Sequence, residues 1–286
     1  MAEDPTTPGE VTTKSGGSDP GLLVGIPLSF GCIIGGLLIE HANPAAYVGI
    51  SPALFVFGGT LGVTTGAVGL KGIQKLPSLM AKAVTYRPQD RVGAIKTLVT
   101  FAEKARREGL LVLEDDLRDC EDEFLRRGVQ LVVDGTDPEL VKEILRTEVD
   151  SLHEELHAEA KTFELMHGVA PTMGIIGTVI GLVVTLSNIA DASSLAAAIA
   201  VAFLATLYGV SSANLIWLPI GVKLQGSADD QVATREMMIE GILAIQSGDN
   251  PRIVEEKLIA FLSIRDRAAY RAALDTGGPE EMDLAA

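Results

Sequence analysis

Charged side chains are missing from four long stretches of this sequence, although the chain as a whole is rich in them. Residues 21–39, 42–70, 165–190 and 192–222 contain no Asp, Glu, Lys or Arg, while the full 286 residues carry a formal net charge of −15. Each stretch is long enough for a helix to cross the hydrocarbon core of a membrane, which takes about 20 residues. An open sheet or an irregular coil would leave its backbone groups without partners in lipid. The sequence therefore predicts an all-α membrane protein with four transmembrane helices in two hairpins.

Basic residues and cysteines are scarce where a secreted protein would have them. The first 20 residues contain only Lys14 against four acidic residues, and no A-x-A-like cleavage site follows the first apolar stretch. This pattern argues against a cleaved signal peptide, and we expect residues 1–20 to form a disordered polar tail. Cys32 lies in the first apolar stretch and Cys120 in a polar segment, so no disulfide within the chain is expected.

The positions of the basic residues indicate how the helices are oriented. Neither short hairpin connection contains Lys or Arg. Basic residues instead follow the second and fourth apolar stretches: Lys71, Lys75, Lys82, Arg87, Arg91 and Lys223. Because cytoplasmic loops carry the excess of Lys and Arg, we expect both termini and the long central segment on the cytoplasmic side.

The central segment, residues 71–164, has no β alternation and is strongly polarised in charge. Residues 71–107 contain nine basic and two acidic side chains, whereas residues 108–164 contain six basic and eighteen acidic ones. We expect a helical cytoplasmic domain here, inserted between the transmembrane hairpins 21–70 and 165–224 and matched by a cytoplasmic helical tail at 225–286. One helix is expected to start at Asp137 and Pro138 and to continue into the third span.

The stretch HEELH, His153 to His157, has the H-E-x-x-H spacing of zinc metalloproteases. A catalytic zinc also needs a third ligand and a pocket in which water is activated. The other histidines, His41 and His167, are expected on the opposite membrane side and at the start of the third span. Acidic residues surround the motif, so a solvated helix face explains it. We expect no metal site, no cofactor and no enzymatic activity.

The third and fourth apolar stretches carry matching rows of small residues: Gly174, Gly177 and Gly181 on one, and Ala198, Ala202, Gly209 and Ala213 on the other. Small residues let helices approach closely in lipid. Thr178 and Thr206 would lie at similar depth, about 20 and 25 Å from the cytoplasmic ends of their helices. Their hydroxyls either bond to their own helices or line a polar ion path. Because the spans contain no carboxylate, a partner would have to supply the ion-binding group.

Five motifs occur together in the order of one known family. They are FGGTLG (57–62), ARREGLLVLEDDL (105–117), GIIGTVIGL (174–182), AIAVAFLATLYGVSSANLIWLPIGVKL (198–224) and MMIEGILAIQSGDNPRIVEEKL (237–258). With these motifs the chain resembles the MotA family of bacterial flagellar motor stator subunits, over a region from about Gly21 to Leu262.

The resemblance implies that several copies of the chain, expected as a pentamer, surround a dimer of a MotB-type protein in the lipid of the bacterial inner membrane. The partner's transmembrane aspartate would supply the missing carboxylate beside Thr178 and Thr206. Ion flow would then produce torque on the rotor protein FliG. Ala205 before Thr206 offers one hydroxyl where sodium-type relatives tend to offer two, which favours H⁺ over Na⁺. No nucleic acid is expected as a partner.

The resemblance also implies roles for two further pairs of residues. Pro171 and Pro219 match the family's functional prolines, and we expect them at one level near the cytoplasmic boundary, where they would couple protonation to movement. Ordinary helix kinks are the alternative. Arg106 and Glu114 match the family's rotor-facing charges, and a solvated helix face is the alternative. Two other classes were weighed: an ion-driven energiser of the ExbB/TolQ type, which has three spans, and a membrane scaffold without transport.

Overall fold

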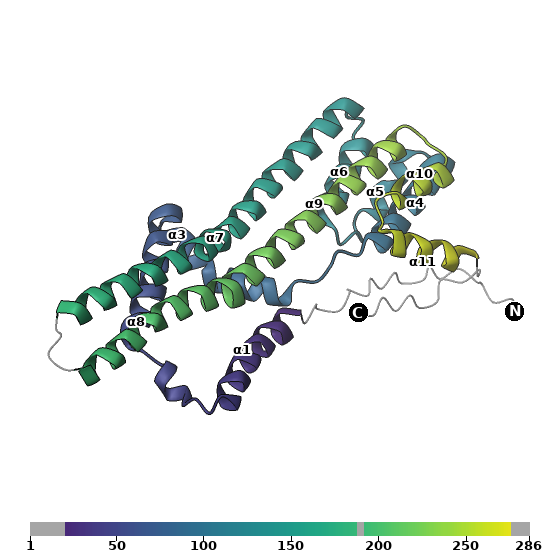
Figure 1. Ribbon diagram of the computed structural model, residues 1–286. Coiled ribbons are helices and arrows are strands. Elements are labelled where there is room, and N and C mark those ends of the chain that lie inside the picture. Colours follow the sequence, from purple (N-terminus) through teal and green to yellow (C-terminus); the bar gives the residue numbers. More distant parts are fainter. Residues whose placement is uncertain (1–20, 188–191, 276–286) are drawn as a thin grey trace, which may run out of the picture. The chain divides into compact units, whose positions relative to one another are not determined.

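Every element in the part of the chain that the structure describes is a helix (Figure 1). This computed structural model describes residues 21–187 and 192–275. Within them, four helical segments are long and apolar enough to cross a membrane: Gly21–Ile39, Pro44–Thr85, Pro138–Ser187 and Ile199–Gln246. The prediction of an all-α protein with four membrane-spanning segments is confirmed.

The apolar segments contain α1 (Gly21–Ile39), η1 (Pro44–Tyr47), α2 (Ile50–Ala53), η2 (Leu54–Gly58), α3 (Gly59–Thr85), α7 (Pro138–Ser187), α8 (Ala192–Ser212), η4 (Ala213–Trp217) and α9 (Leu218–Gln246). The remaining helices are α4 (Arg91–Glu108), η3 (Leu110–Val112), α5 (Leu113–Asp116), α6 (Glu123–Val133), α10 (Pro251–Ile259) and α11 (Ile264–Asp275).

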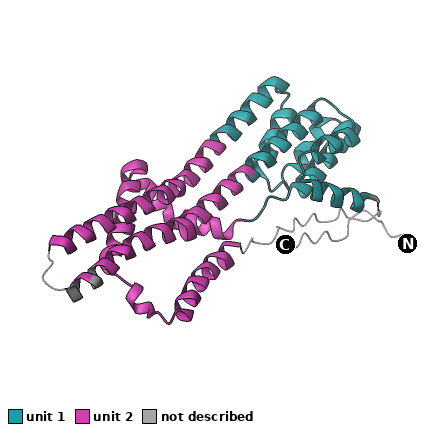
Figure 2. Ribbon diagram, in the orientation of Figure 1, with its two compact units in different colours: residues 1–17, 87–151, 230–286 teal, residues 18–86, 152–229 magenta. Residues whose placement is uncertain are grey.

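The chain divides into two compact units, which Figure 2 shows in different colours. Among the described residues, the span unit comprises 21–86, 152–187 and 192–229, and the loop unit comprises 87–151 and 230–275. The long helices α7 and α9 contribute residues to both. Residues 71–86 and 152–164, which belong to the expected cytoplasmic segment, pack with the apolar helices. The expected membrane borders stay predictions, because a compact unit is not bounded by the membrane.

The second span ends at a break within α3. Gly69 has φ 76° and ψ 168°, a conformation that side chains other than that of glycine rarely adopt. After the break the helix buries Leu76 and Leu79 in one cluster with Phe163 of α7 and Leu224 of α9. This second part of α3 therefore fastens the second span to the third and the fourth.

At its other end, the second span is held by Tyr208 of α8. The Tyr208 hydroxyl donates to the backbone oxygen of Tyr47 at 2.5 Å and accepts the backbone N–H of Gly49 at 2.9 Å. The Tyr208 ring also lies 6.3 Å from the ring of Phe57, between centroids. One side chain thus supplies a hydrogen-bond donor, an acceptor and an apolar contact to the segment that enters α2.

The loop unit is built around one core of buried apolar side chains. Ile95 and Leu98 of α4, Leu145 of α7, Ile242 of α9 and Leu258 of α10 are each fully buried in it. Helices from both ends of the unit's sequence therefore share a single interior. The expected helical domain is present, and it includes much of the segment that we had expected to form a separate tail.

Side-chain caps mark where the helices of the loop unit begin. Asp90, Asp122 and Asn250 accept backbone N–H groups in the first turns of α4, α6 and α10, which satisfies donors that a helix start leaves without partners. The sequence Asp137-Pro138 starts α7 as predicted, and α7 continues through 50 residues, about 75 Å, into the third apolar stretch. That predicted continuation is confirmed.

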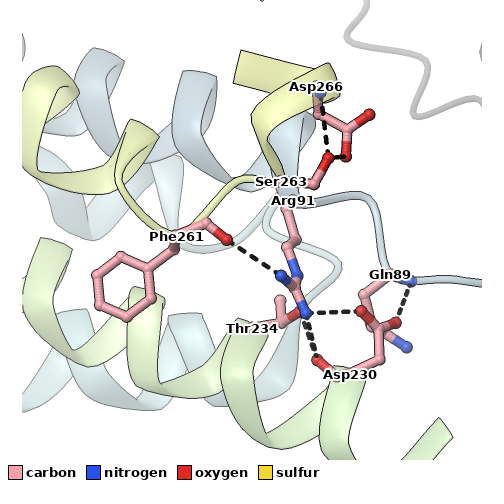
Figure 3. A network of polar contacts seen from close by, with 7 residues as sticks. All are labelled: Gln89, Arg91, Asp230, Thr234, Phe261, Ser263 and Asp266. Carbon is pink, nitrogen blue, oxygen red and sulfur yellow. Dashed lines mark hydrogen bonds and ion pairs between the residues drawn. The ribbon is translucent and has the colours of Figure 1, made fainter. Parts of the chain in front are cut away.

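Arg91, at the start of α4, connects three parts of the loop unit (Figure 3). Its guanidinium donates to the Asp230 carboxylate at 2.7 Å and to the Thr234 hydroxyl at 3.1 Å, both on α9. It also donates to the backbone oxygen of Phe261 at 3.1 Å, just after α10. The second Asp230 oxygen accepts the backbone N–H of Gln89 at 2.9 Å. The side chains of Arg91 and Asp230 are only 23% and 24% exposed, so each would lose solvation without replacement if its partner were removed.

We expect Arg91→Ala to lower the free energy of unfolding of the loop unit by about 2 kcal/mol, because a largely buried carboxylate and a backbone oxygen lose their donor. Denaturant unfolding of the purified protein, followed by hydrogen exchange in α4 and α9, measures this. Arg107→Ala is the matched control, since Arg107 is exposed on the same helix, and its effect should stay below about 0.5 kcal/mol. Equal effects of the two substitutions would contradict a structural role for Arg91.

Candidate functional site

The third and fourth spans meet backbone to backbone along a line that we call the α7–α8 seam. A Cβ added to Gly174 would lie 2.8 Å from the backbone oxygen of Ala205, and one added to Gly209 would lie 2.7 Å from that of Ala170. Backbone atoms cannot move aside as a flexible side chain can, so these positions require glycine. The rows of small residues pack as the sequence suggests, and they leave no space for water or an ion between the two helices.

Thr178 and Thr206 meet in the middle of this seam. Their hydroxyl oxygens are 2.6 Å apart, and the Thr178 oxygen is also 3.0 Å from the backbone oxygens of Gly174 and Ala202. Carbonyl oxygens only accept, so the Thr178 proton goes to one of them and Thr206 donates its own proton to Thr178. The Thr206 oxygen then accepts no hydrogen bond from the described residues. Both side chains are only partly buried, so this oxygen is an available acceptor.

Pro171 and Pro219 do not lie at one level. A Cβ on Gly209 would be 3.2 Å from the Cα of Pro171, whereas one on Gly221, two residues after Pro219, would be 3.3 Å from Phe163. In the antiparallel pairing of α7 with α8 and α9, Pro219 therefore lies about 15 Å further along than the residue that faces Pro171. The expectation that the two prolines pair at one level is wrong within a single chain, because it counted helical rise from assumed membrane borders.

Pro219 follows an irregular turn that the sequence did not indicate. In η4 the backbone widens to π-helical bonding, and the N–H of Leu218 donates to the oxygen of Ala213. Proline has no N–H for the regular helical bond, and π turns are frequent near functional sites. His167 of α7 reaches the same turn, with its Nδ1 atom 3.1 Å from the Ala213 oxygen. This contact depends on the register of two helices that are distant in sequence, so no local motif signals it.

Arg106 and Glu114 are exposed near one end of the loop unit. Arg106 lies in the last turn of α4 and Glu114 in α5, and neither forms an ion pair or side-chain hydrogen bond among the described residues. By contrast, Lys104 donates to both oxygens of Asp116, at 2.6 and 2.9 Å. That ion pair holds α4 to α5 and uses two of the charges that crowd this segment. The charges that remain without internal partners are thus available to another protein.

The HEELH motif lies on α7 within the span unit. The rings of His153 and His157 are 4.1 Å apart, between centroids, and His157 Nε2 lies 3.2 Å from Asp229 Oδ1. Among the described residues, no group of three or more His, Cys, Asp or Glu side chains is placed to hold a metal ion. His157 thus has a partner that explains it without a metal.

Comparisons with known proteins agree on one family. Residues 116–237 match the MotA/TolQ/ExbB proton channel family. Motility protein A from Borreliella burgdorferi is 35% identical over 252 residues, 88% of this chain and 97% of that protein. Among solved structures, MotAB of C. jejuni has 30% identity and a TM-score of 0.81, covering 86% of this chain and 96% of the other. The flagellar MotAB stator complex from Bacillus subtilis has 33% identity and a TM-score of 0.80, covering 86% and 98%.

Four apolar helical segments, a closed seam with a hydroxyl pair and a charged helical unit define a membrane protein of the ion-driven kind, not an enzyme class. The chain belongs to the MotA/TolQ/ExbB proton channel family, and within it to the motility protein A type of flagellar stator subunit.

Replacing both His153 and His157 by alanine should leave motility near its normal level, because the only partner lost is a contact between His157 and the mostly exposed Asp229. Swimming speed and the metal content of purified protein are the measurements. Stoichiometric zinc in the unaltered protein, together with loss of motility in the variant, would establish the metal site that we do not expect.

Proposed function

We propose that this chain forms an ion path together with a MotB-type partner and converts ion flow into torque. The observation that carries the proposal is the Thr178–Thr206 pair, because it is the hydroxyl pair that joins two apolar spans without any charged residue. A free hydroxyl oxygen accepts a hydrogen bond from hydronium or from a protonated carboxyl group. The partner's transmembrane helix supplies the carboxylate that these spans lack.

The closed seam supports a path along the outer edge of the α7–α8 pair rather than through it. Gly174 and Gly209 bring the two backbones into contact, so an ion can reach Thr206 only from the side on which another protein lies. Several copies arranged around a central partner meet this requirement, and we propose a pentamer around a partner dimer. The solved MotAB complexes that resemble this chain contain such a partner by name.

We propose H⁺ as the coupling ion. Ala205, beside Thr206, is buried and apolar, so the site offers the hydroxyls of one threonine pair and no further oxygen side chain. A dehydrated Na⁺ needs several oxygen ligands, because each lost water must be replaced. A proton needs only one acceptor at a time. Flux measured against pH and against sodium concentration distinguishes the two ions.

We propose the bacterial inner membrane as the location, with both termini cytoplasmic, in accordance with the basic residues that follow the second and fourth spans. The loop unit then faces the rotor protein FliG. A contact that forms and releases many times per turn is better served by exposed charges than by apolar burial, because release from a buried apolar contact must overcome the area term each time. Arg106 and Glu114 are exposed charges of this kind.

In this scheme Pro171 and Pro219 act at separate levels of the span unit. Pro171 lies in the seam, and Pro219 lies next to the π turn η4. A change at the seam would pass along α8 to this irregular turn before it reaches α9. An energiser of the ExbB/TolQ type is the alternative function, and the four membrane-spanning segments of the described residues favour the stator instead.

Thr206→Val keeps the side-chain shape but removes the hydroxyl, so ion flux through the assembled complex should fall by about tenfold, the effect of losing one hydrogen bond to a charged species. Flux in vesicles that contain both the chain and its MotB-type partner is the measurement. Thr65→Val is the matched control, because the Thr65 hydroxyl donates only to Leu61 of its own helix. Normal flux in the Thr206 variant would leave this threonine with a packing role alone.

Arg106→Glu should reduce torque several-fold while expression, membrane insertion and ion flux persist, since the charge acts on the rotor and not on the path. Partial recovery is expected when a facing acidic residue of the rotor is reversed. Torque is read from the rotation of tethered cells. Arg252→Glu is the control, because it makes the same charge change at another exposed position of the loop unit. If Arg106→Glu and Glu114→Lys both leave torque unchanged, the electrostatic contact is wrong.

A further inference from the structure

His167 is the one ionisable side chain of the His, Asp, Glu, Lys and Arg types in the apolar stretches 165–190 and 192–222. It lies one turn before Pro171 on α7 and eleven residues before Thr178, which is three turns or about 16 Å along the same helix face. This face forms the seam. His167, Pro171 and Thr178 therefore follow one another along the edge on which the proposed ion path runs.

The hydrogen bond of His167 determines which ring nitrogen can take up a proton. Nδ1 lies 3.1 Å from the Ala213 backbone oxygen, and a carbonyl oxygen can only accept. Nδ1 must therefore carry the hydrogen of the neutral ring, which leaves the lone pair on Nε2. No described residue forms a hydrogen bond with Nε2. The ring is partly buried, so this nitrogen is a base with access from outside the seam.

The surroundings of His167 favour proton exchange with water. Glu164, one turn earlier, is exposed and marks the charged end of the apolar stretch. The other ionisable side chains on its own helix and on neighbouring elements of the span unit are Lys161 on α7, Tyr208 on α8, Lys223 on α9, and Lys71 and Lys75 on α3. Of these, the Tyr208 hydroxyl is already bound to the segment before α2. His167 is thus the imidazole at the junction between the apolar seam and the charged part of α7.

We propose that His167 accepts the transported proton at the cytoplasmic end of the path. A proton released by the partner's carboxyl group passes through water to the lone pair of Nε2, and the ring becomes an imidazolium with hydrogen on both nitrogens. The Nε2 proton then leaves to a cytoplasmic water molecule, which restores the neutral ring. The Nδ1–H bond to Ala213 is kept throughout. This inference rests on the proposed function and on H⁺ as the ion.

The same step links proton passage to the irregular turn. A hydrogen bond from a charged donor is shorter and stronger than one from a neutral donor. While His167 is an imidazolium, its Nδ1–H group therefore holds the first residue of η4 more tightly than before. The turn directly before Pro219 thus experiences each proton as it leaves the path.

The test uses two substitutions in the complete complex with its partner. His167→Asn keeps an amide N–H near the position of Nδ1 but cannot take up a proton, whereas His167→Leu removes both functions. We expect His167→Asn to assemble normally and to reduce proton flux by about tenfold or more, as loss of a positioned base does. His167→Leu should reduce flux at least as much. Normal flux in His167→Asn would overturn the proposal, and loss confined to His167→Leu would leave the residue a structural role only.

A second measurement needs no His167 variant. At a fixed total driving force, flux through the unaltered complex should fall as cytoplasmic pH is lowered through roughly 7.5 to 5.5, the range in which imidazoles become protonated, because Nε2 is then already occupied. The variant without His153 and His157 should keep this profile. A flat profile overturns the role of His167, whereas an unaltered complex that conducts no protons at all overturns the proposed function itself.

Discussion

The close approach of α7 and α8 is the constraint on which the rest of the span unit depends. Glycines at 174 and 209 let the two backbones touch, and this contact fixes the register that brings Thr178 to Thr206 and His167 to Ala213. Because no side chain separates the helices, the polar groups of the seam are accessible only along its outer edge. The closed seam and the missing carboxylates have the same meaning: this chain supplies one wall of a path, and another protein must supply the other.

The loop unit solves a different problem, which is to present charge on a firm support. Lys104 and Asp116 join α4 to α5, while Arg91 joins the start of α4 to α9 and to the end of α10. These ion pairs lie inside the unit and leave Arg106 and Glu114 without internal partners. Charges that are already paired contribute to the frame, and charges that are unpaired are free to act on a neighbour. A row of mixed charges in the sequence does not separate the two kinds.

Features that arise within a few residues could be predicted, and features that arise from register could not. The apolar stretches, the start of α7 at Pro138 and its continuation into the third span follow from local periodicity and capping. The level of the prolines was wrong because α9 continues well past the expected border at residue 224 without interruption, so counted rise had no fixed origin. Gly69 gave no signal either, since a glycine in an apolar run is as consistent with close packing as with a break.

Tyr208 has a mechanical consequence for how the spans can move. By binding the backbone at Tyr47 and Gly49, it makes the outer end of the second span and the middle of α8 a single moving part. A rotation of α8 must then carry the second span with it. The strain of such a movement cannot be absorbed at that end, so it is transferred to the positions where the helices are irregular, at Gly69 in α3 and at the π turn η4. These two positions are the joints of the span unit, and Tyr208 is the pin that holds its far end together.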